Sequence, residues 1–272
     1  AERMASIAEI YGARVRRVKF GFGEDADPRR VEEEISKDRF KAVTVSHVET
    51  STGTCSIVRE VAKVAREHDV FAIVDVVSSL GGMPVKFEDD HFDAAFSSSQ
   101  KCIAGPPGAT LIALSERAKE AIMNRKSPVG SYYFDLRRWF KVTQDPRIYL
   151  VTPTIPVLRA LRVALELLHE EGIENRWKRH REMAELLRKG LKEMGLKIPS
   201  KRPADTVTAV LLDRPISEEV QKYVYEKHQI LIATGIGETK DRFLRIGHLG
   251  LVNREMVERT LAALQEALER VG

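Results

Sequence analysis

The chain contains the run Val70-Phe71-Ala72-Ile73-Val74-Asp75, in which five apolar residues end at a carboxylate. Short apolar runs of this kind are typical of strands that are buried on both faces of a parallel sheet. An amphipathic helical pattern over residues 56–68 precedes the run, and further strand patterns lie at residues 42–45 and 93–96. Because strands alternate with helices in this way, the sequence predicts the α/β class with a mostly parallel sheet.

The alternation extends over the first 172 residues, and the pattern changes after Gly172. We therefore predict a large three-layer domain at residues 1–172 and a smaller C-terminal α+β domain at residues 173–272. In the large domain, strands are expected at residues 14–20, 42–45, 70–74, 93–96 and 109–113, and helices at residues 27–37, 56–68 and 156–171. In the small domain, strands are expected at residues 206–212, 230–233 and 243–246, and helices at residues 174–194, 217–228 and 253–271.

Composition and charge are those of an ordinary globular protein. The 44 Lys and Arg residues against 40 Asp and Glu residues leave a net charge of only +4, and the signs alternate along the predicted helices, so we expect no nucleic-acid partner. No apolar run approaches the roughly 20 residues that a membrane-spanning helix needs, so we expect no membrane partner. The two cysteines have no metal-type spacing, and we expect no bound metal and a reducing, cytoplasmic compartment.

Polar side chains follow three of the predicted strands. His47 comes after the strand at residues 42–45, Asp75 ends the run at residues 70–75, and Lys101 lies in the turn after the strand at residues 93–96. In an open α/β sheet, ligands bind beyond the carboxyl ends of the strands. We therefore expect these three side chains to converge on one crevice that holds the functional site.

Lys101 ends the stretch Ser97-Ser98-Ser99-Gln100-Lys101 and is followed by the cluster Gly105-Pro106-Pro107-Gly108. One interpretation is an exposed loop cation, as for many lysines. The other starts from its setting between two strands and behind small hydroxyl residues, where a lysine can be desolvated. Desolvated lysines are nucleophiles that form Schiff bases with carbonyl compounds.

Asp75 and Arg245 each have two interpretations as well. A carboxylate at the end of a buried strand is costly unless a cation faces it, and Asp75 would be satisfied by a helix cap, by a lysine or by a protonated pyridine nitrogen. Arg245 would serve in a structural ion pair, or would bind a carboxylate through the two parallel hydrogen bonds of its planar guanidinium. The residues alone leave these alternatives open.

Five blocks of the sequence, in one order, resemble the class V (fold type I) aminotransferases that use pyridoxal phosphate (PLP), in particular the alanine-glyoxylate and serine-pyruvate aminotransferase branch. The resemblance spans essentially the whole chain, and it implies the PLP-transferase fold for the large domain and PLP as the cofactor. The blocks are His47-Val48-Glu49-Thr50-Ser51-Thr52-Gly53, Asp75 with Ser78-Ser79-Leu80-Gly81-Gly82, Ser99-Gln100-Lys101 with Pro106-Pro107-Gly108, Thr154-Ile155-Pro156 and Leu244-Arg245-Ile246-Gly247.

The resemblance also implies roles for individual residues. Lys101 would carry PLP as a Schiff base and Asp75 would pair with the pyridine nitrogen, so that both are catalytic and cofactor-binding residues. Gln100 would contact the cofactor phosphate, and Thr50 would lie beside the ring. Arg245 would bind the carboxylate of the substrate.

The sequence departs from the family pattern around Thr154 and at its start. Thr154 resembles a threonine that reaches the cofactor phosphate of the neighbouring subunit, which implies a homodimer. The tyrosine common three positions before that threonine is Val151 here, with Tyr149 two residues earlier. Ala1 matches a point just after the family's N-terminal segment, which holds a phosphate loop and a ring-stacking aromatic residue, and we expect the chain as it stands to bind PLP poorly.

The implied activity is the transfer of an amino group from a small amino acid, alanine or serine, to a 2-oxo acid, glyoxylate or pyruvate. Two alternatives stay open. A PLP-dependent lyase or desulfurase of the same fold would need a mobile loop cysteine, and Cys55 and Cys102 are both poorly placed for it. The other alternative is a PLP-free binding scaffold that keeps the fold.

Overall fold

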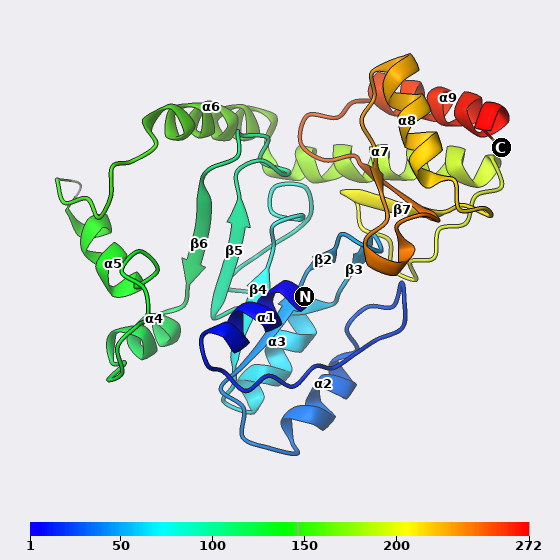
Figure 1. Ribbon diagram of the computed structural model, residues 1–272. Coiled ribbons are helices and arrows are strands. Elements are labelled where there is room, and N and C mark those ends of the chain that lie inside the picture. The colour runs from blue at the N-terminus through cyan, green and yellow to red at the C-terminus, as the bar shows by residue number, and fades with distance from the viewer. Residues whose placement is uncertain (146, 272) are drawn as a thin grey trace.

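The computed structural model describes residues 1–145 and 147–271, and its largest sheet has four strands (Figure 1). The strand order is β1-β4-β5-β6, and the strands are Ala42–Ser46, Phe71–Asp75, Ala94–Ser98 and Thr110–Leu114. β1 and β4 pair in parallel, as do β4 and β5, whereas β6 runs antiparallel to β5 at the edge. The mostly parallel sheet of an α/β fold is therefore confirmed.

Helices surround this sheet and help to form its core. α2 begins as expected, because the Asp27 side chain accepts a hydrogen bond from the Arg29 N–H and Pro28 occupies the first helical position. α3 packs its buried apolar face, which includes Val61 and Ala65, against β1 and β4. The helices of this part are α1 (Glu2–Ile10), α2 (Pro28–Ile35), α3 (Val58–Glu67), α4 (Glu116–Met123), α5 (Leu136–Gln144) and α6 (Ile155–Glu171).

A smaller sheet is built from the C-terminal part of the chain. Its strands β7 (Val207–Leu211), β8 (Ala233–Thr234) and β9 (Phe243–Gly247) lie in the antiparallel order β7-β9-β8. The helices α7 (Ile173–Glu193), α8 (Ser217–His228) and α9 (Arg254–Val271) pack on it around an apolar core that includes Leu191, Val210 and Leu264. The remaining short elements are β2 (Val48–Glu49), β3 (Thr54–Cys55) and the 3-10 turn η1 (Gly237–Thr239). Across residues 1–145 and 147–271, none of the helices is long and apolar enough to cross a membrane.

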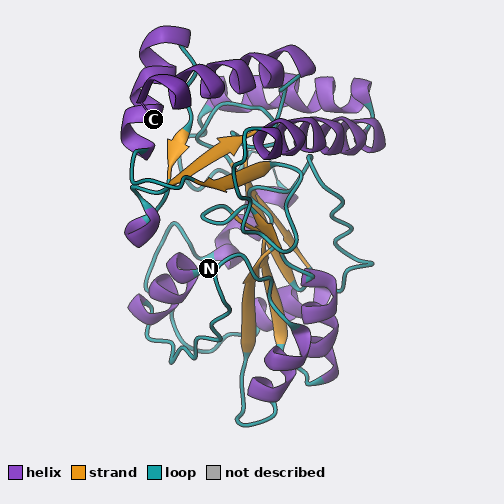
Figure 2. Ribbon diagram, turned by 90° about the vertical axis from the view of Figure 1, so that its right-hand side faces the viewer, coloured by secondary structure: helices purple, strands orange, loops and turns teal. Residues whose placement is uncertain are grey.

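α6 and α7 run one after the other from the four-stranded sheet to the smaller one (Figure 1). Gly172 separates them with a φ of 81°, a left-handed value that favours glycine. Figure 2 shows the smaller sheet and its helices above the larger sheet. The division of the chain into two domains at Gly172 stays a prediction.

Two of the predicted strands differ from the structure. Residues 14–20 form no strand, because this mostly exposed segment has no strand beside it and Arg17 instead binds the carboxylates of Glu2 and Glu9 on α1. At residues 230–233, the strand begins only at Ala233, after Gln229 has ended α8 in a left-handed conformation. The prediction is therefore wrong for residues 14–20 and three residues early for β8.

The two sheets meet through close contacts at two glycines. At Gly53, whose φ is 65°, a Cβ would lie 2.8 Å from the Ala209 nitrogen on β7. At Gly82, a Cβ would lie 2.7 Å from the Cys102 sulfur and 3.0 Å from the His180 ring on α7. Glycine at these positions therefore lets the loops beyond β1 and β4 lie directly against the smaller sheet and α7.

The Gly82→Ala substitution should destabilise the protein by about 1–3 kcal/mol, because the added methyl group overpacks a site without room for it. Chemical denaturation measures the free energy of unfolding. Gly130→Ala is the matched control, since nothing lies within 4 Å of its Cβ position, and its stability should change by less than about 0.5 kcal/mol. Equal stability of the two variants would contradict the close contact.

Candidate active site

The parallel strands of the larger sheet end at one edge, where the sequence predicts a crevice. Asp75 ends β4 and lies in register with Phe96 on β5, and Lys101 follows in the turn after β5. The His47 N–H, just past β1, donates a hydrogen bond of 2.9 Å to the Asp75 carbonyl. The strand pairing therefore places the predicted aspartate, at the end of its strand, and the lysine and histidine, on the loops that follow, at the same edge of the sheet.

Asp75 is a partly buried carboxylate without a cation beside it. Its Oδ1 accepts a hydrogen bond of 2.8 Å from the Val77 N–H. Burial is the largest influence on the pKa of Asp75 and raises it. The hydrogen bond from the Val77 N–H and the charges of the N-terminal ammonium group and Arg3 lower the pKa, the Glu49 carboxylate raises it, and the net shift is upward. Among the described residues, no lysine, arginine or histidine forms an ion pair with Asp75. The positive groups near Asp75 therefore do not offset its burial, and the ionised carboxylate has no paired cation among the described residues.

Glu49 on β2 links Asp75 to the smaller sheet electrostatically. Burial favours the neutral form of Glu49, but hydrogen bonds from the Ser51 hydroxyl and N–H and the N-terminal ammonium group outweigh burial, so that the pKa of Glu49 is lowered. The same carboxylate acts on both Asp75 and Arg245. The three charged groups therefore belong to one neighbourhood, although they come from β2, β4 and β9.

Arg245 lies in the middle of β9 with part of its guanidinium unused. Its Nε donates a hydrogen bond of 2.7 Å to the Thr234 carbonyl on β8. Burial lowers the pKa of Arg245, and the Glu49 carboxylate opposes that shift. Its Nη groups make no hydrogen bond to any residue in the described ranges. This arrangement leaves a fixed planar donor that can take a carboxylate.

Lys101 lies in a turn that backbone bonds hold in shape. The Ala104 N–H donates to the Lys101 carbonyl at 2.9 Å, and the Gly105 N–H donates to the Ser99 carbonyl at 2.8 Å. Ala104 has a left-handed φ of 63°, which is uncommon for a residue with a Cβ. The partly buried Lys101 ammonium has no hydrogen-bond or ion-pair partner within residues 1–145 and 147–271. The turn is thus ordered while the amine is left available.

His47 supports the site as a neutral ring. It is buried, and its Nδ1 lies 2.9 Å from the Ser79 hydroxyl. Burial lowers the pKa of His47 to about 4, so that the imidazole carries no charge at neutral pH. His47 therefore does not supply the positive charge that Asp75 lacks.

The other three predicted site residues, Thr50, Gln100 and Thr154, have no hydrogen bond to the site residues described above, within the part of the chain that the structure describes. Thr50 is partly buried in the turn after β2, and Gln100 is exposed beside Lys101. Thr154 is exposed at the N-terminus of α6, and its side chain does not cap the helix. Their roles therefore stay predictions.

Sequence reasoning assigned no role to Ser98 or Glu49. The Ser98 hydroxyl, at the end of β5, is buried and has no hydrogen-bond partner among the described residues. Its position three residues before Lys101 was the available signal. For Glu49 the signal was its place beside Thr50 in a loop at the end of a strand, but its closeness to Arg245 depends on the packing of the two sheets.

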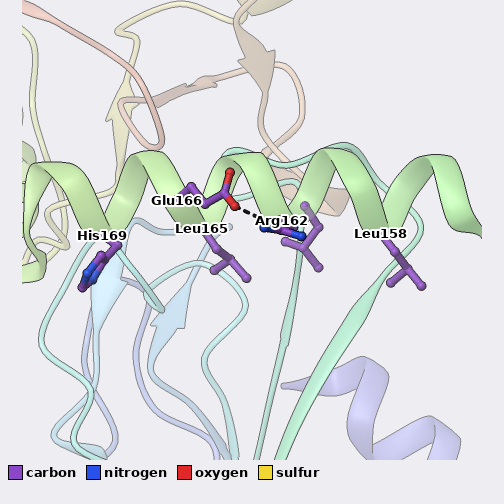
Figure 3. A pocket seen from close by; sticks show the side chains of 6 residues that line it. Leu158, Arg162, Leu165, Glu166 and His169 are labelled. Carbon is purple, nitrogen blue, oxygen red and sulfur yellow. Dashed lines mark hydrogen bonds and ion pairs between the residues drawn. The ribbon is translucent and has the colours of Figure 1, made fainter. Parts of the chain in front are cut away.

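The structure also has a shallow hollow on α6, away from these residues (Figure 3). Its volume is about 400 Å³, and an ion pair in its lining joins Arg162 to Glu166. It is lined by Leu158, Leu161, Arg162, Leu165, Glu166 and His169. This lining offers no nucleophilic amine and no unpaired acid, so the strand ends remain the better candidate for the chemistry. No group of three or more His, Cys, Asp and Glu side chains that could hold a metal ion occurs among the described residues.

The chain matches the family model of the class-V aminotransferases over residues 2–241. It belongs to this family. Class-V aminotransferases are PLP-dependent transaminases, and the predicted enzyme class and PLP-transferase fold are therefore confirmed.

Similar proteins cover almost the whole of this class-V aminotransferase. An uncharacterized aminotransferase of Methanocaldococcus jannaschii is 38% identical, over 100% of this chain and 71% of the relative. The alanine–glyoxylate aminotransferase of Oryctolagus cuniculus is 35% identical, over 98% of this chain and 70% of the relative. The crystal structure of an alanine–glyoxylate aminotransferase from Nostoc sp. superposes with a TM-score of 0.94 at 31% identity, over 98% of this chain and 72% of that one.

The residues at the strand ends fit the cofactor that this family implies. Asp75 lacks a cation, and a protonated pyridine nitrogen would supply one. Lys101 offers an amine without a partner among the described residues, and the buried Ser98 hydroxyl there lacks a hydrogen-bond partner. An aldehyde-bearing pyridine with polar substituents matches all three of these groups.

The Asp75→Asn substitution should raise the melting temperature of the PLP-free protein at neutral pH. The pKa of Asp75 is raised in the folded chain, so the ionised carboxylate lowers stability above that pKa, and the loss disappears as the pH falls through it. The gain of the variant should therefore shrink in acid, as thermal melts at several pH values would show.

Asp93→Asn is the matched control, with the opposite sign. Burial favours neutral Asp93, but the hydrogen bonds from Arg117, the Ala72 N–H and Ser115 outweigh it and lower the pKa of Asp93. Its removal should lower the melting temperature at neutral pH. A loss of stability in Asp75→Asn would contradict the account of an uncompensated carboxylate.

Proposed function

We propose that this class-V aminotransferase moves the amino group of a small amino acid, alanine or serine, to a 2-oxo acid, glyoxylate or pyruvate. The names of its relatives support this substrate class, since they include alanine–glyoxylate and serine–glyoxylate aminotransferases. The observation that carries the proposal is the unpaired Asp75 carboxylate at the same sheet edge as the free Lys101 amine. A cytoplasmic location and a homodimer in which Thr154 reaches the partner's cofactor phosphate are parts of the same proposal.

Each residue has a physical task in this reaction. Lys101 would hold the cofactor through a covalent bond from its amine and, once released, would carry the proton that leaves and returns at the substrate Cα. Asp75 would keep the ring nitrogen protonated, because its ionised form needs a cation. PLP, when bound, supplies an electron sink for the electrons left on Cα.

The remaining residues would orient the substrate and the cofactor. The Nη groups of Arg245 would bind the substrate carboxylate by two parallel hydrogen bonds, which fixes the direction of the Cα–H bond. Thr50 would lie beside the ring, and Gln100 would reach the phosphate group. The hydroxyl of Ser98 is a further donor at the end of β5.

The chemistry of the two cysteines speaks against a desulfurase. Burial raises the pKa of the Cys102 thiol to about 12 and that of the Cys55 thiol to about 11. A desulfurase needs a reactive thiolate, and thiols with such pKa values are protonated at neutral pH. The transaminase is therefore the better supported member of the fold.

Lys101→Ala should abolish transamination and the yellow absorbance of lysine-bound PLP together, because no second amine lies in the turn after β5. Alanine and glyoxylate serve as the substrate pair, and a PLP titration followed by absorbance gives the second readout. Each protein is measured with the family's N-terminal segment supplied, because the chain as it stands is expected to bind PLP poorly. Lys119→Ala, at an exposed lysine on α4, should leave both unchanged. Transamination that survives in Lys101→Ala would remove Lys101 from its assigned role.

A further inference from the structure

A fully buried arginine on α7 contacts the backbone of the turn that carries Lys101. Arg176 has an exposed fraction of 0%, and its Nη2 donates a hydrogen bond of 2.8 Å to the Cys102 carbonyl. Its Nη1 forms an ion pair of 3.1 Å with Glu171 at the end of α6. A buried guanidinium is costly unless its donors are used. Nε of Arg176 has no hydrogen-bond partner among the described residues, so the bonds from Nη1 and Nη2 are the ones that offset its burial, and the Nη2 bond holds the turn against α7.

The same Glu171 carboxylate binds a second arginine, Arg179, which contacts the loop after β9. Arg179 donates to Glu171 from Nε at 2.6 Å and from Nη2 at 3.0 Å. It also donates to the Gly250 carbonyl at 3.0 Å and to the Val252 carbonyl at 2.8 Å, in the loop that follows β9 and Arg245. Glu171 therefore joins an arginine that holds the Lys101 turn to one that holds the loop after Arg245.

Gly250 is where these two segments touch. Its N–H donates a hydrogen bond of 3.0 Å to Nε2 of the buried His180. The φ of Gly250 is 76°, a left-handed value that favours glycine. A Cβ at this position would lie 3.4 Å from the Lys101 carbonyl oxygen and 3.2 Å from the Cβ of Ala104, so the glycine lets the two segments approach closely. The His180 Nδ1 in turn lies 2.8 Å from the Arg176 carbonyl. The loop after β9 is thus fixed from both sides directly against the turn of Lys101.

We propose that Arg176 and Arg179, joined through Glu171, are positioning residues that fix the Lys101 turn relative to the strand of Arg245. This inference rests on the proposed function of Lys101 and Arg245. Arg176 acts on the turn through the Cys102 carbonyl, and Arg179 acts on the loop after β9 through the Gly250 and Val252 carbonyls. The distance between the amine that holds the cofactor and the guanidinium that binds the substrate is then set by one cluster, which is centred on the partly buried Glu171 carboxylate.

The two arginines should differ in the kinetic constant that they change. Arg176→Met frees the turn of Lys101, so that kcat should fall by roughly tenfold or more while KM for alanine changes little, because misplaced reacting groups slow the chemical step. Arg179→Met frees the loop after Arg245, so that KM for alanine should rise more than kcat falls. A purely structural pair would show no such division.

Hydrogen exchange gives a readout that needs neither PLP nor activity. In Arg176→Met, the amides of Ala104 and Gly105, which bond within the Lys101 turn, should exchange roughly tenfold faster or more in the PLP-free protein. Arg179→Met should instead speed the exchange of the Gly250 amide. Arg188→Met is the control, since this arginine lies further along α7 and binds Ala204 and Asp205, and the amides of the Lys101 turn should keep their rates in it.

Unchanged exchange at Ala104 and Gly105 in Arg176→Met, with kcat also unchanged, would overturn the inference even if the melting temperature falls. Should Arg176→Met fail to fold, Arg176→Lys decides, because lysine keeps the charge but cannot bond Glu171 and Cys102 in the same planar geometry. Faster exchange at Ala104 and Gly105 is expected there too, and unchanged exchange would overturn the inference. The exchange rates do not depend on the role of Lys101, so transamination surviving in Lys101→Ala would overturn the proposed function separately.

Discussion

The parallel pairing of β4 with β5 is the constraint on which the candidate site depends. Because Asp75 lies in register with Phe96, the carboxyl ends of β4 and β5 lie side by side, and Lys101 follows five residues after Phe96. Neighbouring parallel strands present their carboxyl ends at the same edge, which is where ligands of α/β sheets bind. The backbone hydrogen bonds around Lys101 and the contact of Gly250 with that turn then fix the position of the Lys101 backbone, from which the amine extends.

Charge explains why this edge suits a cationic ring and an anionic substrate. Asp75 is partly buried and has no ion-pair partner among the described residues, while the Nη groups of Arg245 make no hydrogen bond there. Partly buried charged groups without partners lower the stability of the ligand-free protein. They are commonly found at functional sites, where a bound ligand supplies the missing partner. Glu49 acts on both groups, because its negative charge disfavours the ionised form of Asp75 and favours the protonated form of Arg245.

Local signals made much of the fold predictable. The apolar run that ends at Asp75 forms β4, and Asp27 with Pro28 begins α2 as expected. The strand predicted at residues 14–20 is wrong because a local pattern does not supply a neighbouring strand, and Arg17 binds α1 instead. Within the site, Lys101 and Asp75 stand in recognisable motifs, whereas the contact of Arg176 with Cys102 joins residues that are 74 positions apart and follows only from tertiary packing.

The central claim is that the positive charge missing beside Asp75 is the protonated ring nitrogen of PLP. The nitrogen-15 NMR shift of labelled PLP tests it most directly, with PLP bound to the original protein and to Asp75→Asn and the family's N-terminal segment supplied to both. The account predicts the shift of a protonated pyridine in the original protein and that of a neutral pyridine in Asp75→Asn, since the variant lacks the carboxylate that favours the charged form. The same shift in both proteins would show that Asp75 does not face the ring nitrogen, and would contradict the assignment of the site.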